Sequence, residues 1–274
     1  MLYASAALQF QERARARKVC LGVHHSAMSP QLIELYGHLA LDYVIVSTEV
    51  ESLDKYSLEN LLRAGDAAHT VPIVKLLRND PCLVQEAMNA GAPMVMVPHV
   101  TTRAELDAAV SASRFSPEGS RGLCPVARYT GYGTLTMDAA VAAARRSHSI
   151  IPIIEDRAAL ANLEELMASP DVDIFEIGPF DLSQSLGLRP ELGYGNPEVL
   201  AIVEQIGRLA RNNGKSVFAP LWLPKEADTS AKVISVQMEQ LIKRGINMFY
   251  GIEVLMLARV FRDWLGLRDL DADA

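Results

Sequence analysis

Two carboxylates stand at the ends of apolar, strand-like runs of the chain. Glu155 follows the run Ile150-Ile-Pro-Ile-Ile, and Asp181 ends the segment Phe175-Glu-Ile-Gly-Pro-Phe-Asp. In parallel α/β proteins the carboxyl ends of the strands carry the ligand site, so the two acids are expected close together. Carboxylate oxygens without nearby Cys or His suit Mg²⁺ or Mn²⁺, with water or substrate at the remaining positions. The pair predicts a divalent-metal site, whereas an isolated strand-end acid or a helix N-cap at Asp181 would need no metal.

Eight short apolar runs alternate with helical patterns along the chain. Most are continuous, as expected of parallel strands buried on both faces. The runs are Val19–Val23, Tyr43–Ser47, Ile73–Leu77, Met94–Pro98, Ile150–Ile154, Ile174–Ile177, Ser216–Ala219 and Asn247–Tyr250. In one connecting segment Asp80 and Pro81 begin a helix and Gly91 ends it, and another repeats apolar residues from Leu160 to Met167. Eight such units predict an α/β fold, a TIM (β/α)8 barrel, as a single domain over residues 1–274.

Two segments exceed a minimal barrel. The stretch 115–133 is a long loop with Gly, Pro and Arg, and we expect it on the ligand side, where Arg128 would contact substrate. The last helix, Ile252–Trp264, is apolar almost all round. A lone surface helix would show a polar face, so this helix is expected to be buried against another subunit.

Composition excludes several classes of protein. The 274 residues are 50% hydrophobic with a formal charge of −7 and no basic block, which argues against nucleic-acid and membrane partners. Cys20, Cys82 and Cys124 are widely spaced, which indicates a reducing compartment rather than a disulfide scaffold or zinc site. The amino-terminal segment turns charged too early for a secretory signal, and no segment is apolar enough to span a bilayer. We therefore predict a cytoplasmic protein.

Motifs spread over the chain are similar to those of one enzyme family. They are Asp42-Tyr-Val-Ile-Val, Val71-Pro-Ile-Val-Lys, Asn79-Asp-Pro, Ala90-Gly, Val97-Pro-His-Val, Pro117-Glu-Gly-Ser-Arg-Gly-Leu-Cys-Pro, Ile154-Glu and Ile177-Gly-Pro-Phe-Asp-Leu-Ser. In this order they resemble the HpcH/HpaI aldolase family, class II pyruvate aldolases with a modified TIM barrel. The resemblance implies that Glu155 and Asp181 bind a divalent metal, which chelates pyruvate or a related 2-oxo acid and stabilises its enolate. It also implies a homo-oligomer, hexameric or dimer-based, with the C-terminal helix domain-swapped between neighbours.

The chain departs from the family pattern at four linked positions. Where the family has Asp-x-Glu-His after the second strand, this chain has Ser47-Thr-Glu-Val, so Val50 replaces the acid/base His. Lys75 replaces the Arg that polarises the keto oxygen, and Asn89 replaces the acid that partners the His. Because Val50 cannot transfer a proton, retro-aldol cleavage cannot run in its family form.

Other residues are candidates for the missing chemistry. His24 and His25 follow the first strand, and only one of these adjacent side chains is expected to face the pocket as a replacement base. Glu49 is a candidate to orient metal-bound water. Lys75 is expected to hold or polarise the substrate as an anion anchor, a role that we prefer to Schiff-base formation.

Beside the second metal ligand, the backbone is expected to take part in binding. Gly178 and Pro179 shape this loop, and N–H groups near Gly178 and Phe180 would contact the ligand.

Three functions fit these residues. The first is a divalent-metal-dependent carbon–carbon lyase of aldolase or decarboxylase type, acting on a pyruvate- or oxaloacetate-like 2-oxo acid. The second is a citrate-synthase-like condensation of oxaloacetate with an acyl donor in siderophore biosynthesis. The third is a catalytically retired family member that only binds ligand. Because nothing structural demands two carboxylates in one pocket, Glu155 and Asp181 favour an enzyme over the retired member.

Overall fold

Eight parallel strands close into a barrel within the residues that the computed structural model describes, which are 2–221 and 231–265. Each strand pairs with its neighbours in sequence, and β1 pairs with β8 to complete the ring. The strands are β1 (Cys20–His25), β2 (Tyr43–Ser47), β3 (Val71–Lys75), β4 (Met94–Val97), β5 (Ser149–Ile154), β6 (Ile174–Ile177), β7 (Ser216–Pro220) and β8 (Met248–Ile252). The predicted TIM barrel is confirmed, and the predicted strand ends differ from the observed ones by at most 2 residues.

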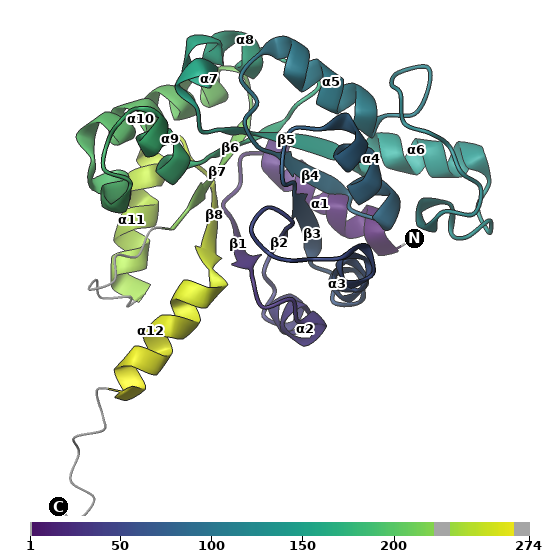
Figure 1. Cartoon of the computed structure of the whole chain (residues 1–274), viewed down its shortest axis with the longest axis horizontal. Coiled ribbons are helices and arrows are strands. Elements are labelled where there is room, and N and C mark those ends of the chain that lie inside the picture. The colour runs from purple at the N-terminus through teal and green to yellow at the C-terminus, as the bar shows by residue number, and fades with distance from the viewer. Residues whose placement is uncertain (1, 222–230, 266–274) are drawn as a thin grey trace, which may run out of the picture.

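Helices lie around the outside of the barrel, except α12, which extends away from it (Figure 1). They are α1 (Leu2–Arg15), α2 (Pro30–His38), α3 (Lys55–Ala67), α4 (Pro81–Ala90), α5 (Arg103–Ser113), η1 (Arg128–Thr130), α6 (Met137–Ser147), α7 (Arg157–Ala161), α8 (Leu163–Met167), α9 (Pro179–Ser185), η2 (Pro190–Gly195), α10 (Pro197–Asn212), α11 (Ala231–Lys243) and α12 (Glu253–Leu265).

Local signals explain where two of these helices begin and end. Helix α4 is capped as predicted, because the Asp80 side chain accepts a hydrogen bond from the Cys82 N–H and Gly91 adopts a left-handed conformation with φ of 112°. The predicted helix through Leu160 and Met167 is instead divided at Asn162 into α7 and α8. The Asn162 side chain donates a hydrogen bond to the Thr101 carbonyl at 2.8 Å, which anchors this break.

Alternate residues of each strand face the barrel interior or the surrounding helices. On β2, Tyr43 and Ile45 belong to an inner apolar cluster, which also includes Ile73, Met96, Ile153, Ile174 and Phe218. Val44 and Val46 belong to an outer cluster that packs between the strands and the helices. This alternation decides which strand-end polar side chains point toward the barrel axis.

Helix α1 closes the amino-terminal end of the barrel. The Phe10 ring lies 5.5 Å from the Tyr43 ring, and the Ser216 hydroxyl donates to the Ala14 carbonyl at 2.6 Å. Tyr43 and Ser216 are the first residues of their strands. Because this end is filled, the ligand site is expected at the opposite end, where the strands finish.

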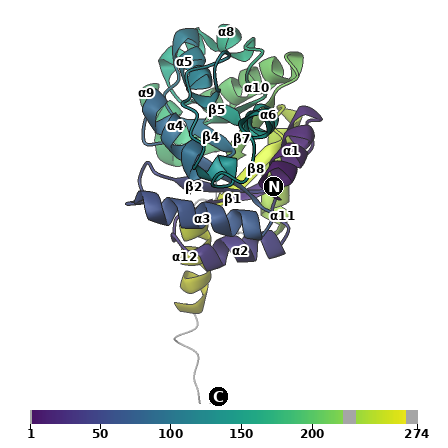
Figure 2. The same ribbon diagram turned by 90° about the vertical axis from the view of Figure 1, so that its right-hand side faces the viewer.

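Helix α12 extends away from the barrel in both views (Figure 1 and Figure 2). The predicted burial of this helix is not met within one chain, because its apolar side chains are exposed. They include Val254, Leu255, Met256, Leu257, Val260, Phe261 and Trp264. Burial against another subunit, with or without a domain swap, stays a prediction. None of the described helices combines the length and the apolar character needed to cross a bilayer.

Candidate active site

Glu155 follows the last residue of β5 and has the inward parity of Ile151 and Ile153. The residue is 1% exposed, and its Oε1 accepts a hydrogen bond from the His99 backbone N–H at 2.9 Å. Burial raises the pKa of Glu155 to about 7, although the His99 N–H and the Lys75 ammonium group act in the opposite direction. A buried carboxylate at a strand end is costly unless a cation or further donors compensate its charge.

Asp181 lies in the first turn of α9, just beyond the end of β6, and its side chain is exposed. Close by, His99 Nδ1 lies 2.9 Å from Asp156 Oδ2 and 3.5 Å from Glu155 Oε1. Burial lowers the pKa of His99, but the hydrogen bond to Asp156 and the charges of Glu155 and Asp181 outweigh burial and raise it above its ordinary value. The fold thus places Glu155 and Asp156 beside one imidazole, and Asp181 in the turn that follows the neighbouring strand.

Lys75 ends β3 on the inner side of the barrel, and its Nζ lies 2.5 Å from Glu49 Oε2. Burial lowers the pKa of Lys75, but Glu176, Glu49 and Glu155 together outweigh burial and raise it. A Schiff-base nucleophile must be a neutral amine, so this environment favours the predicted anion anchor. Glu49 forms an ion pair with Lys75, and the Glu49 backbone N–H donates a hydrogen bond to the Ser47 hydroxyl at 3.1 Å.

Glu176 is a site residue that sequence reasoning missed. It lies on β6 with the inward parity of Ile174, and it is 2% exposed. The Tyr250 hydroxyl on β8 donates to Glu176 Oε1 at 2.5 Å. A signal was present, because an acid inside a strand that is otherwise apolar and buried on both faces needs a partner in the protein.

The two adjacent histidines face opposite sides of β1. His24 has the inward parity of Cys20, and its ring centroid lies 6.3 Å from that of Tyr250. His25 faces outward, where Nδ1 lies 2.6 Å from Glu253 Oε2 and Nε2 accepts the Ser29 N–H at 3.0 Å. Both ring nitrogens of His25 therefore make polar contacts outside the barrel and do not face the barrel mouth. The predicted catalytic role of His25 is wrong for this geometry, and His24 remains the candidate base.

The loop after β6 was expected to offer backbone N–H groups to a ligand, and the structure gives Gly178 and Pro179 another role. The Gly178 N–H donates to the Ile154 carbonyl at 3.2 Å and Pro179 has no N–H, so neither contributes the predicted backbone donor. Gly178 instead leaves space for Glu155, because a Cβ at Gly178 would lie 2.6 Å from Glu155 Oε2. Phe180 is the next residue of this turn, half-buried, at the start of α9.

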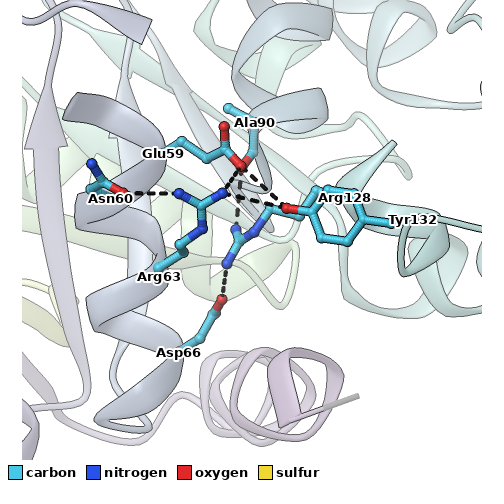
Figure 3. Close-up of polar contacts among 7 residues, drawn as sticks. All are labelled: Glu59, Asn60, Arg63, Asp66, Ala90, Arg128 and Tyr132. Atoms are coloured by element: carbon cyan, nitrogen blue, oxygen red, sulfur yellow. Dashed lines mark hydrogen bonds and ion pairs between the residues drawn. The ribbon is translucent and has the colours of Figure 1, made fainter. Parts of the chain in front are cut away.

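Arg128 does not reach the Glu155 end of the barrel. Its guanidinium lies 2.5 Å from Asp66 Oδ2 near the end of α3 and donates to the Ala90 carbonyl, the last residue of α4, at 3.2 Å (Figure 3). Tyr132 of the same loop contacts Glu59 and Arg63 on α3.

The predicted position of loop 115–133 on the ligand side is therefore wrong. The loop follows α5, and helices in this fold finish where the strands begin, opposite Glu155. Arg121 anchors the loop from within, at 4.6 Å from the centroids of both the Phe115 and Tyr129 rings. It also donates to Asn89 Oδ1 at 3.1 Å and lies 2.9 Å from His148 Nδ1.

The donor set of the barrel mouth fits a hard divalent cation. Among the described residues no group of three or more His, Cys, Asp or Glu side chains is arranged to enclose a metal. Mg²⁺ commonly binds through one or two carboxylates, with water and substrate completing its shell. Glu155 and Asp181 are the expected pair, and the buried carboxylate of Glu155 is a hard oxygen donor.

The family is decided by a match over most of the chain. Residues 21–246 match the family model of the HpcH/HpaI aldolase/citrate lyases. The chain belongs to this family. It is 37% identical over 167 residues to the 2-dehydro-3,6-dideoxy-6-sulfogluconate aldolase of Pseudomonas putida, covering 61% of this chain and 65% of that protein. It is 32% identical over 201 residues to the pyruvate aldolase of Rhizobium etli, covering 73% and 78%.

Solved structures share the fold. An HpcH/HpaI aldolase from Desulfitobacterium hafniense superimposes with a TM-score of 0.83 at 22% identity, covering 96% of this chain and 97% of that one. The citrate synthase SbnG gives a TM-score of 0.78 at 24% identity, covering 96% and 98%. A citrate lyase β subunit from M. tuberculosis, complexed with oxaloacetate and magnesium, gives 0.57 at 16% identity, covering 86% and 92%. As a member of this family, the protein is an enzyme of the aldolase and lyase type.

Proposed function

We propose that this HpcH/HpaI family member is a divalent-metal-dependent carbon–carbon lyase that acts on a pyruvate- or oxaloacetate-like 2-oxo acid. The observation that carries the proposal is the buried carboxylate of Glu155 in the same barrel mouth as the ammonium group of Lys75. One side chain suits a hard cation and the other suits a substrate anion. A 2-oxo acid presents both a metal-chelating edge and a negative charge.

Each residue has a defined part in this proposal. Glu155 and Asp181 would hold Mg²⁺ or Mn²⁺, which would supply Lewis-acid polarisation of the keto group. Lys75 binds the substrate carboxylate or keto oxygen as a fixed positive charge, and Glu49 holds Lys75 from the β2 side. Burial of Glu155 strengthens its interactions, because charges interact more strongly where water is excluded.

His24 is the proposed base for steps that move a proton. Burial lowers the pKa of His24, an effect that Lys75 reinforces and that Glu51 and Glu49 oppose. The imidazole is therefore neutral under physiological conditions and able to accept a proton. Val50 is 77% exposed and offers no titratable group. Decarboxylation of an oxaloacetate-like acid would need no base in this position.

The comparisons support the substrate class. Relatives that are 37% and 32% identical are named as aldolases, one of them for pyruvate. The more distant citrate lyase β subunit, at 16% identity, was solved with oxaloacetate and magnesium. These names support a small 2-oxo acid and a divalent metal.

Proton NMR in D₂O with Mg²⁺ tests the proposal. The protein is expected to exchange deuterium into the pyruvate methyl group or to consume oxaloacetate faster than Mg²⁺ alone. Glu155→Ala should abolish both, whereas the control Glu164→Ala, on the exposed side of α8, should retain both. Protein that binds Mg²⁺ but leaves both acids unchanged would contradict the proposal.

Condensation of oxaloacetate with an acyl donor is the second candidate. The SbnG citrate synthase shares this fold over 96% of the chain, which is the observation that favours it. In the same NMR experiment, acetyl-CoA added with oxaloacetate would give a new carbon–carbon product if the protein condenses them. Consumption of oxaloacetate that is independent of acetyl-CoA would favour the lyase.

We also infer that the protein acts as a homo-oligomer. The exposed apolar row on α12, with Phe261 54% and Trp264 64% exposed, is of a kind that proteins cover with a partner. Light scattering after size exclusion should give an oligomer, and Phe261→Glu should reduce its mass. A monomeric wild-type protein would contradict this inference.

A further inference from the structure

Tyr250 connects two polar side chains across the barrel interior. It is buried on β8, and its hydroxyl donates a hydrogen bond to Glu176 Oε1 on β6 at 2.5 Å. The centroid of its ring lies 6.3 Å from that of His24 on β1, with 31° between the two ring planes. Aromatic rings attract one another at centroid separations of about 4.5–7 Å, so these two rings are in contact. One tyrosine therefore links an acid on β6 to an imidazole on β1.

Glu176 holds the tyrosine by its hydroxyl group. The acid is 2% exposed, and its strand neighbours by register are Ile153 on β5 and Phe218 on β7. Among the described residues, only the Tyr250 hydroxyl donates a hydrogen bond to Glu176, and the buried Oε2 has no partner. A buried oxygen without a partner costs stability, so packing alone would favour an apolar side chain here. The contact with Tyr250 gives the acid a reason to be present.

The His24 imidazole has few other contacts. Its Nδ1 lies 3.4 Å from the Ser26 hydroxyl oxygen, which is long for a hydrogen bond. Within the part of the chain that the structure describes, Nε2 has no hydrogen-bond partner. The ring of Tyr250 is therefore the neighbour that limits how the imidazole turns about its side-chain torsions. Nε2 is the nitrogen left to exchange a proton with a substrate.

We propose that Tyr250, itself held by Glu176, is a positioning residue that orients the His24 imidazole with Nε2 toward the substrate. The role of His24 as a base rests on the proposed function, whereas the contact between the two rings does not.

The proton that His24 moves is one of the methyl protons of pyruvate. Nε2 takes this proton, and the electron pair of the C–H bond stays on the substrate as an enolate. In D₂O the nitrogen exchanges the proton with solvent and returns a deuteron to the same carbon. Such a transfer requires the nitrogen to be held in line with the C–H bond, which is the part that the proposal gives to Tyr250.

Two reactions of the same protein test this role, because exchange of the pyruvate methyl protons needs a base and decarboxylation of oxaloacetate does not. NMR in D₂O with Mg²⁺ follows both reactions. Tyr250→Leu should lower kcat for exchange about 10–100-fold and leave KM within about twofold, because the base is present but misaligned. Decarboxylation should change by less than about twofold. An equal fall in both reactions, or unchanged exchange in the folded variant, would overturn the proposal.

Variants of Glu176 test whether it acts through Tyr250. Glu176→Gln keeps an acceptor for the tyrosine hydroxyl and should keep exchange within about threefold of the wild-type rate, whereas Glu176→Leu should slow it about tenfold. In a Tyr250→Leu background, Glu176→Leu should slow exchange by less than about twofold further, because the ring to be held is gone. This double variant leaves no unpaired acid, so it also serves if Tyr250→Leu alone does not fold. An equal effect of Glu176→Leu in both backgrounds would overturn the proposal.

Tyr43 provides the matched control. It is also a buried tyrosine of the barrel interior, and its hydroxyl donates to the Phe249 carbonyl at 2.6 Å. It stands at the start of β2, however, at the end of the barrel that α1 closes. Tyr43→Leu should lower the melting temperature and leave the ratio of the exchange rate to the decarboxylation rate unchanged. A fall in this ratio equal to that of Tyr250→Leu would show that loss of any interior ring is sufficient, and the proposal would be overturned.

NMR of the His24 ring separates this inference from the proposed function. If the wild-type protein neither exchanges pyruvate nor consumes oxaloacetate, the proposed function fails, but the ring signals can still be measured after assignment with His24→Gln. Glu176→Leu should move the His24 signals when Tyr250 is present and leave them in place in the Tyr250→Leu background. Movement in both backgrounds, or in neither, would show that Glu176 does not position His24 through the tyrosine.

Discussion

Replacing Gly178 by alanine should displace the proposed metal ligand Glu155. The added Cβ would lie 2.6 Å from Glu155 Oε2 and 2.8 Å from Glu155 Cβ, whereas ordinary contact begins at 3.4 Å. The carboxylate would therefore have to move by about 0.8 Å, which exceeds the tolerance of roughly 0.2 Å for a metal–ligand distance. The backbone at Gly178, with φ −91° and ψ 84°, lies outside the left-handed region, so the clash rather than the backbone dominates the effect.

The expected result is a loss of metal affinity with a moderate loss of stability. Mn²⁺ binding, measured by calorimetry or electron paramagnetic resonance, should weaken about 10–100-fold. Overpacking costs about 1–3 kcal/mol, which corresponds to a fall in melting temperature of roughly 2–5 °C for a domain of this size. Gly122→Ala is the matched control, because a Cβ there would meet no atom within 4 Å. A folded Gly178→Ala variant with wild-type Mn²⁺ affinity would refute the reasoning.

Three further predictions concern residues away from the metal ligands. His25→Ala should lower the free energy of unfolding by about 3–5 kcal/mol in urea denaturation, because it leaves Glu253 buried without its partner; a change near zero would show that the pair does not support the fold. Arg128→Met should cost roughly 3 kcal/mol and speed proteolysis of loop 115–133, because Asp66 loses its cation; unchanged cleavage would contradict the anchoring role. Burial and Arg121 lower the pKa of His148 to about 3, below the value of about 6.5 in the unfolded chain. Between these two values the unfolded state binds a proton that the folded state does not, so stability falls as the pH drops from about 6.5 to about 3. His148→Gln should flatten the fall, which for a half-buried ring amounts to less than about 1.4 kcal/mol per pH unit. An identical pH profile of the variant in urea denaturation would argue against a half-buried, neutral His148.

Much of the scaffold could be predicted from local patterns. Continuous apolar runs of 4 to 6 residues mark the strands because parallel strands are buried on both faces. Asp80 and Gly91 mark the limits of α4 because capping depends on residues next to one another in the chain. Glu155 and Asp181 can be predicted as candidate ligands for the same reason, since the end of a strand can be recognised in the sequence.

The predictions that differ from the structure concern the direction of a side chain or the end of the barrel at which a loop lies. His24 and His25 are adjacent, yet one faces the barrel and the other pairs with Glu253, because successive strand residues point to opposite faces. Loop 115–133 lies at the end opposite to the expected one, because it follows α5 and helices in this fold finish where the strands begin. Arg128 in this loop consequently pairs with Asp66 rather than with a ligand.

The sequence by itself determined the barrel, the family motifs and the two strand-end carboxylates, because all three depend on short-range order in the chain. Only the tertiary structure decided that Glu176 meets Tyr250 inside the barrel and that Lys75 faces the same interior. These residues lie on β3, β6 and β8, so their proximity arises only when the ring of strands closes. Closure also removes water from their surroundings, and hydrogen bonds and charges act more strongly where water is excluded.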